Sequence, residues 1–144
     1  MNIRVGVATL ACLLSSTAAA ANECGLDFEE ANFSSISSEI GAKALDEHGE
    51  DFVSPSPRKN KKLPWTLSTK EDIAELVEDI FRENDKATRD GSTDLAVVTK
   101  ELSADRIAWW DDNTGTFVVF DPRNEDCGTA YRPEKGKKEY DDAT

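Results

Sequence analysis

The sequence predicts an α+β domain in which N-terminal helices pack on an antiparallel β-sheet meander of three to four strands. In the first half of the chain, apolar residues recur every three or four positions, which is the spacing of one face of an α-helix. In the second half, four short runs rich in β-branched and aromatic residues alternate with turn signals. Because the strands follow the helices instead of alternating with them, the α+β class is favoured over a parallel sheet.

Residues 1–21 have the layout of a secretory signal peptide. Arg4 supplies a positive charge, an apolar run covers residues 5–14, and small residues lead to cleavage expected after Ala20 or Ala21. The apolar run is too short to span a bilayer, so we expect cleavage instead of a membrane anchor. The chain would then be exported to the periplasm or out of the cell, with no membrane attachment.

Cleavage also decides which cysteines remain. Of the three cysteines, Cys12 leaves with the signal peptide, and Cys24 and Cys127 stay. A cysteine pair in an exported chain predicts a disulfide, although two free thiols remain the alternative. In the chain-entropy model, closing a loop of about 100 residues is worth up to about 4.7 kcal/mol.

The first helix is expected over residues 34–48, with Gly49 as its stop. Its apolar side repeats every four residues at Ile36, Ile40 and Ala44. Glycine is common just past a helix end because it adopts the left-handed conformation without strain. Residues 53–64 hold three prolines and a basic run at 58–62, which predicts an exposed loop.

The second helix begins with a predicted capping box at Ser68 and Glu71. An apolar stripe with the spacing i, i+3, i+4, i+7 and i+8 follows. It consists of Ile73, Leu76, Val77, Ile80 and Phe81. This pattern is typical of an amphipathic helix of about four turns that lies on a core.

Four strands are expected in the second half of the chain. They cover residues 94–100, 106–111, 116–121 and 128–132. Between the second and third strands, Asp-Asp-Asn-Thr-Gly is favourable for a hairpin, with Gly115 able to take a positive φ. We therefore expect one domain over residues 22–133, followed by a charged tail at 134–144 that lacks a core pattern and frays.

Composition and motifs exclude several classes of protein. The 144 residues carry 29 acidic and 17 basic side chains, a net charge of −12, which excludes a polycationic nucleic-acid binder. Zinc-protease, phosphate-loop, serine-hydrolase and CxxC motifs are missing from the sequence. The carboxylates at 111–112 and at 121–126 do not have calcium-loop spacing, and we assign them to turns and surface. We therefore expect no metal and no cofactor.

His48 is the only histidine, and it lies at the end of the first predicted helix. A side chain that exchanges protons near neutral pH suits a general acid or base. A histidine that ends a helix can equally serve as a cap or a packing residue.

The strands offer a second group of candidate residues. Strand alternation places Arg106 and Trp110 on one face and Trp109 on the other, and Thr129 and Tyr131 share a face. A guanidinium binds phosphate oxygens and an aromatic ring stacks on a base, so such a face suits a nucleotide. Alternatively, the tryptophans belong to the core and Arg106 pairs with a carboxylate; for Trp109 we favour the core.

The order of these segments resembles C-terminal toxin domains of bacterial polymorphic and contact-dependent toxins. The similarity rests on HGEDF at 48–52, an amphipathic helix, Arg106, WDDNTGTFVV at 110–119 and DCGTAYRP at 126–133, together about two thirds of the chain. Those domains belong to the ribonuclease superfamily of barnase, colicin D and RelE type. They place helices before a four-stranded antiparallel sheet.

The resemblance implies cleavage of RNA without a metal ion, in which the ribose 2′-hydroxyl attacks the adjacent phosphate. By matching positions, His48 would be the general base or acid and Arg106 the phosphate clamp. Thr129, with Tyr131 or Arg132, would contact phosphate and base. The partners would be an RNA substrate and a cognate inhibitor, and we expect a monomer.

The acidity of this chain keeps other classes open. An exported binding or immunity protein without catalytic activity could use an acidic face to block a basic partner. It would show a contiguous acidic patch with exposed aromatics and no cleft around His48. The ribonuclease hypothesis instead requires His48, Arg106 and Thr129 to converge on one cleft. A third possibility is a small exported domain of other function stabilised by the disulfide.

Overall fold

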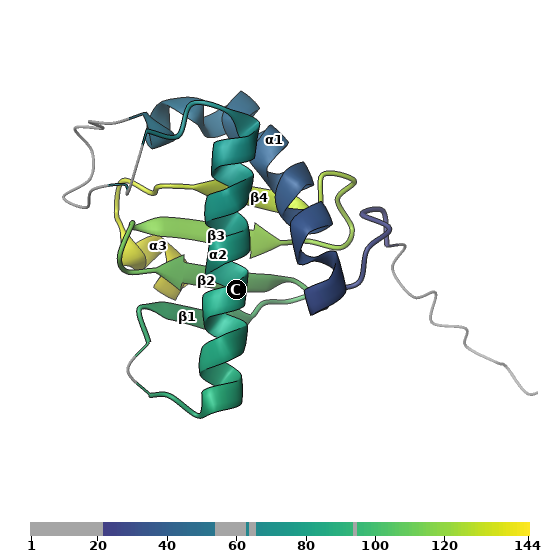
Figure 1. The fold of residues 1–144 in the computed structure, drawn as a ribbon, viewed down its shortest axis with the longest axis vertical. Helices are drawn as coiled ribbons and strands as arrows, with labels where there is room; N and C mark the ends of the chain where they lie inside the picture. Colours follow the sequence, from purple (N-terminus) through teal and green to yellow (C-terminus); the bar gives the residue numbers. More distant parts are fainter. Residues whose placement is uncertain (1–21, 54–62, 64–65, 94) are drawn as a thin grey trace, which may run out of the picture.

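The computed structural model describes residues 22–53, 63, 66–93 and 95–144, which form an α+β fold (Figure 1). The signal segment and the basic run at 58–62 lie outside the described residues. In chain order the elements are a 3-10 turn (Glu30–Asn32), α1 (Phe33–Phe52), α2 (Lys70–Asp90), β1 (Val97–Glu101), β2 (Ile107–Asp111), β3 (Thr116–Phe120), β4 (Gly128–Tyr131) and α3 (Lys137–Asp142).

The four strands form one antiparallel sheet in the order β1-β2-β3-β4, as the sequence predicts. The register pairs Trp110 with Phe117 and Phe117 with Tyr131, so these three aromatic residues lie in a row on one face. Gly115 takes a φ of 70° in the β2–β3 hairpin. β1 and β2 begin later than expected, at Val97 and Ile107.

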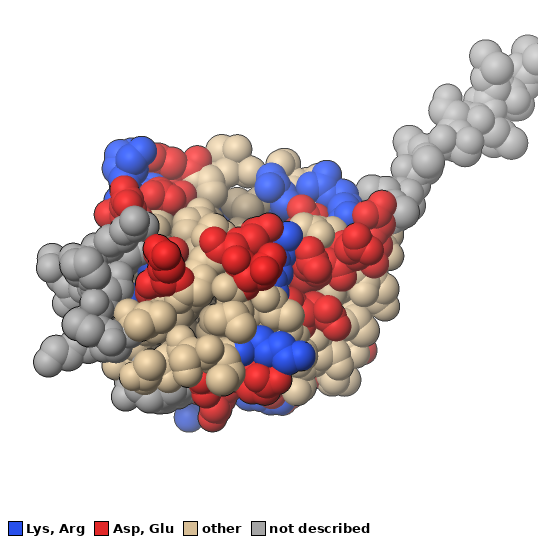
Figure 2. Space-filling view, turned by 90° about the horizontal axis from the view of Figure 1, so that it is seen from above, with Lys and Arg blue, Asp and Glu red and all other residues tan. Residues whose placement is uncertain are grey.

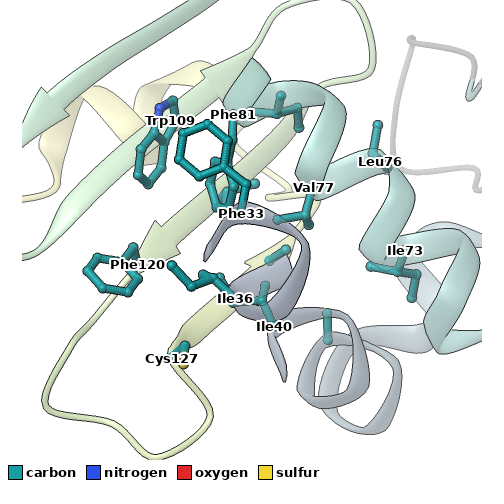
Figure 3. Packing of buried hydrophobic residues seen from close by; sticks show 14 of the residues in the cluster. Phe33, Ile36, Ile40, Ile73, Leu76, Val77, Phe81, Trp109, Phe120 and Cys127 are labelled. Carbon is teal, nitrogen blue, oxygen red and sulfur yellow. The ribbon is translucent and has the colours of Figure 1, made fainter. Parts of the chain in front are cut away.

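The main core lies between α1, α2 and one face of the sheet, which we call the first face (Figure 3). The opposite face, on which α3 lies, is the second face. α2 crosses the first face, and every residue of its predicted apolar stripe is buried. Trp109 is 1% exposed and packs against Phe81 with ring centroids 4.7 Å apart. Trp109 is therefore a core residue, as the sequence favours.

The capping box of α2 lies one residue later than predicted. Thr69, not Ser68, is the N-cap: its Oγ1 accepts from the amide of Asp72 at 3.1 Å, and Asp72 Oδ2 accepts from the amide of Thr69 at 3.0 Å. The hydrogen bonds from the Thr69 side chain and then the Ser68 and Thr69 amides hold the pKa of Asp72 below its ordinary value. Glu71 is displaced from the box because the helix begins at Lys70, which makes Asp72 the third residue.

The prediction that α1 stops at Gly49 is wrong. The helix breaks at His48, with φ −134° and ψ 16°, and then continues to Phe52. Gly49 is not among the residues with a positive φ, so it does not supply a left-handed cap. Phe52 is 0% exposed in the core, and burial of its ring stabilises the extra turn.

The end of the chain forms a helix in place of the expected frayed tail. In Figure 1, α3 lies on the side of the sheet opposite α2. Tyr140 is 6% exposed and packs edge-on against Phe117, with ring centroids 5.9 Å apart. Tyr140 is the one buried residue of α3, so the sequence of this segment has no periodic apolar pattern that would predict a helix.

The expected disulfide is present between Cys24 and Cys127. It joins the N-terminal segment to the turn before β4, and Cys127 is fully buried. A buried disulfide is consistent with an exported protein. Among the described residues, the helices lack the length and apolarity needed to cross a membrane.

We expect the double variant Cys24→Ser, Cys127→Ser to lose about 4–5 kcal/mol of unfolding free energy. The bond closes a loop with a sequence separation of 103 residues, so its loss raises the conformational entropy of the unfolded chain. Urea unfolding followed by tryptophan fluorescence measures the difference. The reduced wild-type chain should match the double variant, and equal stability of the oxidised and reduced chains would contradict the prediction.

Candidate functional site

A pocket of about 420 Å³ opens on the second face of the sheet, the face opposite α2. Its floor comes from Phe117 and Val119 on β3 and from Thr129 and Tyr131 on β4. The end of α1 forms one wall, and the β1–β2 turn with the last residues of the chain forms another. The wall residues include Lys43, Glu47, His48, Leu102, Arg106, Ala143 and Thr144.

His48 reaches the pocket because α1 runs along β4, the edge strand of the sheet. Its ring lies 5.1 Å from the ring of Tyr131, centroid to centroid, with 33° between the planes. Nε2 is 3.9 Å from Oε2 of Glu47, and the side chain is 34% exposed. The imidazole is thus supported by an aromatic ring and a carboxylate while it remains open to solvent.

Arg106 enters from the opposite wall, just before β2. Ala104 and Asp105 both take a φ of 62°, which turns the chain tightly enough to bring Arg106 back toward Ser103. Nε donates to the Ser103 carbonyl at 3.1 Å, and Nη2 donates to Ser103 Oγ at 3.0 Å and to the main-chain oxygen of Thr144 at 2.8 Å. None of these acceptors is an aspartate or glutamate side chain, so the predicted alternative of a surface carboxylate partner is not what the described residues show.

β4 supplies two hydroxyl-bearing residues, Thr129 and Tyr131, to the floor of the pocket. Thr129 Oγ1 is buried and has no hydrogen-bond partner within the described part of the chain. Tyr131 is packed between His48 and Phe117. Burial, and then the charge of Glu139, raise the pKa of Tyr131 above its ordinary value. The phenol therefore stays protonated at neutral pH and can donate a hydrogen bond.

The carboxylates at the rim have cationic partners. Lys43 Nζ lies 3.0 Å from both Glu47 Oε1 and Asp126 Oδ2. The hydrogen bonds to Glu47 and then to Asp126 raise the pKa of Lys43. Asp121 accepts from Arg123 Nε at 3.2 Å. Despite the negative charge of the whole chain, the pocket thus holds balanced charges around His48 and Arg106.

Two predicted substrate-binding residues, Trp110 and Arg132, do not line the pocket. Trp110 is 4% exposed, and its Nε1 donates to Asp112 at 3.3 Å. Arg132 is 2% exposed; its guanidinium donates to the carbonyls of Thr114 and Asp51, both at 3.1 Å. Alternation continued past β4 puts Arg132 on the face of Gly128 and Ala130, opposite Thr129 and Tyr131, so its side chain turns inward instead of toward a ligand.

Four predicted residues, His48, Arg106, Thr129 and Tyr131, are brought together, and several others are added. Lys43 and Glu47 lie five residues and one residue before His48 on the same helix. Their helical spacing is a signal in the sequence from which these pocket residues could have been predicted. The place of Thr144 depends on the packing of Tyr140, and the sequence gives no signal for it.

Comparison of the chain with family models, curated protein sequences and solved structures finds no match. Within the described ranges, no group of three histidine, cysteine, aspartate or glutamate side chains is placed to hold a metal ion. Any assignment of function therefore depends on the chemistry of the pocket residues.

The two tyrosines provide a test of the packing on this face. Burial raises the pKa of both Tyr131 and Tyr140. Each folded tyrosine therefore holds its proton more tightly than the unfolded one, so the free energy of unfolding should fall as the pH rises above about 10. Tyrosinate absorbance should appear at higher pH in the folded chain than in urea.

Tyr131→Phe should leave a single transition, from Tyr140, since the sequence has two tyrosines. Equal tyrosinate midpoints in the folded and unfolded chains would show that these rings are not buried as described.

Proposed function

We propose that this chain is a secreted ribonuclease-like toxin or effector domain that cleaves RNA without a metal ion. The observation that carries the proposal is the shared pocket of His48, Arg106, Thr129 and Tyr131. These residues come from the end of α1, the start of β2 and the edge strand β4. Together they offer a proton acceptor, a cation and two hydroxyl donors, which is the set that cleavage of a phosphodiester by a neighbouring hydroxyl requires.

His48 is the general base of the proposed reaction. Neutral imidazole takes the proton of the ribose 2′-hydroxyl, whose oxygen attacks the adjacent phosphorus. The bond from phosphorus to the 5′-oxygen breaks, and that oxygen takes a proton from solvent in the open pocket. The products are a 2′,3′-cyclic phosphate and a 5′-hydroxyl. The Glu47 carboxylate, 3.9 Å from Nε2, offsets the positive charge that the ring gains.

Arg106 and the β4 hydroxyls bind the phosphate in this proposal. A guanidinium presents paired donors that match two phosphate oxygens and stabilises the charge of the transition state. Thr129 and protonated Tyr131 add hydrogen bonds from the pocket floor. The stacked rings of Tyr131 and His48 offer an aromatic surface for a base.

The pocket dimensions favour a flexible single strand as the substrate. A volume of about 420 Å³ lies within the range of small-ligand pockets, about 300–1,000 Å³. It takes one nucleotide with its phosphate, whereas a duplex would need a long basic groove. The net charge of −12 repels a polyanion at long range, so binding relies on local contacts in the pocket.

The alternative of an acidic binding or immunity protein is less well supported. It requires no cleft around His48, and His48 lines one. On the face shown in Figure 2, the carboxylates are spread in several groups between basic and uncharged residues instead of forming one patch.

The decisive experiment is RNA cleavage by the oxidised chain without its first 21 residues, in EDTA, beside a His48→Ala variant. EDTA removes metal-dependent nucleases that contaminate preparations. We expect cleavage that leaves cyclic phosphate ends, and His48→Ala should lower the rate at least about 100-fold because it removes the base. DNA of the same sequence should stay intact, since it lacks the 2′-hydroxyl.

Lys70→Ala is the matched control, because Lys70 is exposed on α2 and does not line the pocket. It should cleave at the wild-type rate. No cleavage by a folded wild-type chain, or equal cleavage by folded His48→Ala, would overturn the proposal. In the first case the binding-protein alternative would take its place.

A further inference from the structure

The last eight residues, 137–144, form a segment that we call the C-terminal strap. It consists of α3 and the two residues after it, Ala143 and Thr144. Tyr140 anchors the strap in the apolar cluster on the second face of the sheet, beside the pocket. Ala143 and Thr144 then continue into the pocket wall.

Cationic side chains hold the end of the strap through its main-chain oxygen atoms. Lys100 Nζ donates to Ala143 at 2.7 Å and to Asp141 at 3.2 Å. Arg106 Nη2 donates to Thr144 at 2.8 Å, and Ser103 Oγ lies 3.5 Å from the same oxygen. Donor groups of Lys100 and Arg106 that could bind an anionic ligand are thus already hydrogen-bonded to main-chain oxygens of the strap.

The contact between the main-chain oxygen of Thr144 and Arg106 affects both ways in which a guanidinium binds phosphate. One pair of parallel donors is Nε with Nη2, and the other is Nη1 with Nη2. Nη2 belongs to both pairs, and it is the nitrogen that Thr144 occupies. Nε is also engaged, by the Ser103 carbonyl. A phosphate that binds Arg106 in a two-pronged manner must therefore compete with the strap.

We propose that the C-terminal strap is an autoinhibitory contact that blocks the phosphate site at Arg106. This inference rests on the proposed function for the role of Arg106. The block is reversible, because a phosphate that accepts from both Nη1 and Nη2 replaces the single hydrogen bond that Thr144 accepts from Arg106. Release involves Ala143 and Thr144 alone, whose side chains are half-buried and exposed, while Tyr140 keeps α3 in place.

The test is a titration of the oxidised chain with inorganic phosphate at constant pH and ionic strength. Binding is followed by the imidazole proton resonances of His48, the only histidine. A chain that ends at Asp142, and separately Lys100→Met, should bind phosphate at least about tenfold more tightly than wild type, the effect of one hydrogen bond to a charged group. The gain in Lys100→Met is expected even though the variant loses a positive charge.

Lys70→Met is the control for that lost charge, because Lys70 lies on α2 across the sheet, and its affinity should equal that of wild type. Arg106→Gln should abolish binding. Phosphate affinity that is unchanged or lower in both the shortened chain and Lys100→Met would overturn the inference.

RNA cleavage by the same shortened chain separates this inference from the proposed function. Tighter phosphate binding without RNA cleavage would support the strap and remove the ribonuclease assignment. RNA cleavage together with unchanged phosphate affinity would keep the ribonuclease and remove the strap.

Discussion

The buried guanidinium of Arg132 joins the last turn of α1 to the β2–β3 hairpin, through the carbonyls of Asp51 and Thr114. Burial lowers the pKa of Arg132, and the nearby charge of Asp51 acts in the opposite direction. A hydrogen bond to a charged group is worth about 1.5–3 kcal/mol, so these two bonds fix the helix end firmly. Because α1 breaks at His48 and continues to the turn that Arg132 holds, the placement of His48 over β4 depends on it.

The same arrangement gives α1 two tasks. Its N-terminal part supplies Phe33, Ile36 and Ile40 to the core on the first face of the sheet (Figure 3). Its C-terminal part covers the edge strand β4, which protects that edge from pairing with another chain. The second face of the sheet is left to the pocket and to α3. The main core and the candidate site thus use opposite faces of the same sheet.

Sequence reasoning succeeded where the controlling interactions are local. The stripe of α2 and the hairpin at Gly115 follow from helical spacing and turn chemistry, and strand alternation placed Trp109 in the core. It failed where a distant contact decides. Phe52 prolongs α1 past Gly49 because its ring is buried, and Tyr140 orders the charged tail by packing on Phe117. The guanidinium of Arg132 is chemically suited to contact a phosphate, but the side chain is turned inward and holds the end of α1.

The central claim is that the pocket beside His48 and Arg106 is a nucleotide site. The most direct measurement is the change in backbone amide resonances on addition of a dinucleotide without the 2′-hydroxyl, which can bind but cannot be cleaved. We predict that the largest shifts cluster at His48, Arg106, Thr129 and Tyr131, with Thr144 shifting as the strap is displaced. Shifts confined to other surfaces such as α2, or none at saturating ligand, would contradict this claim.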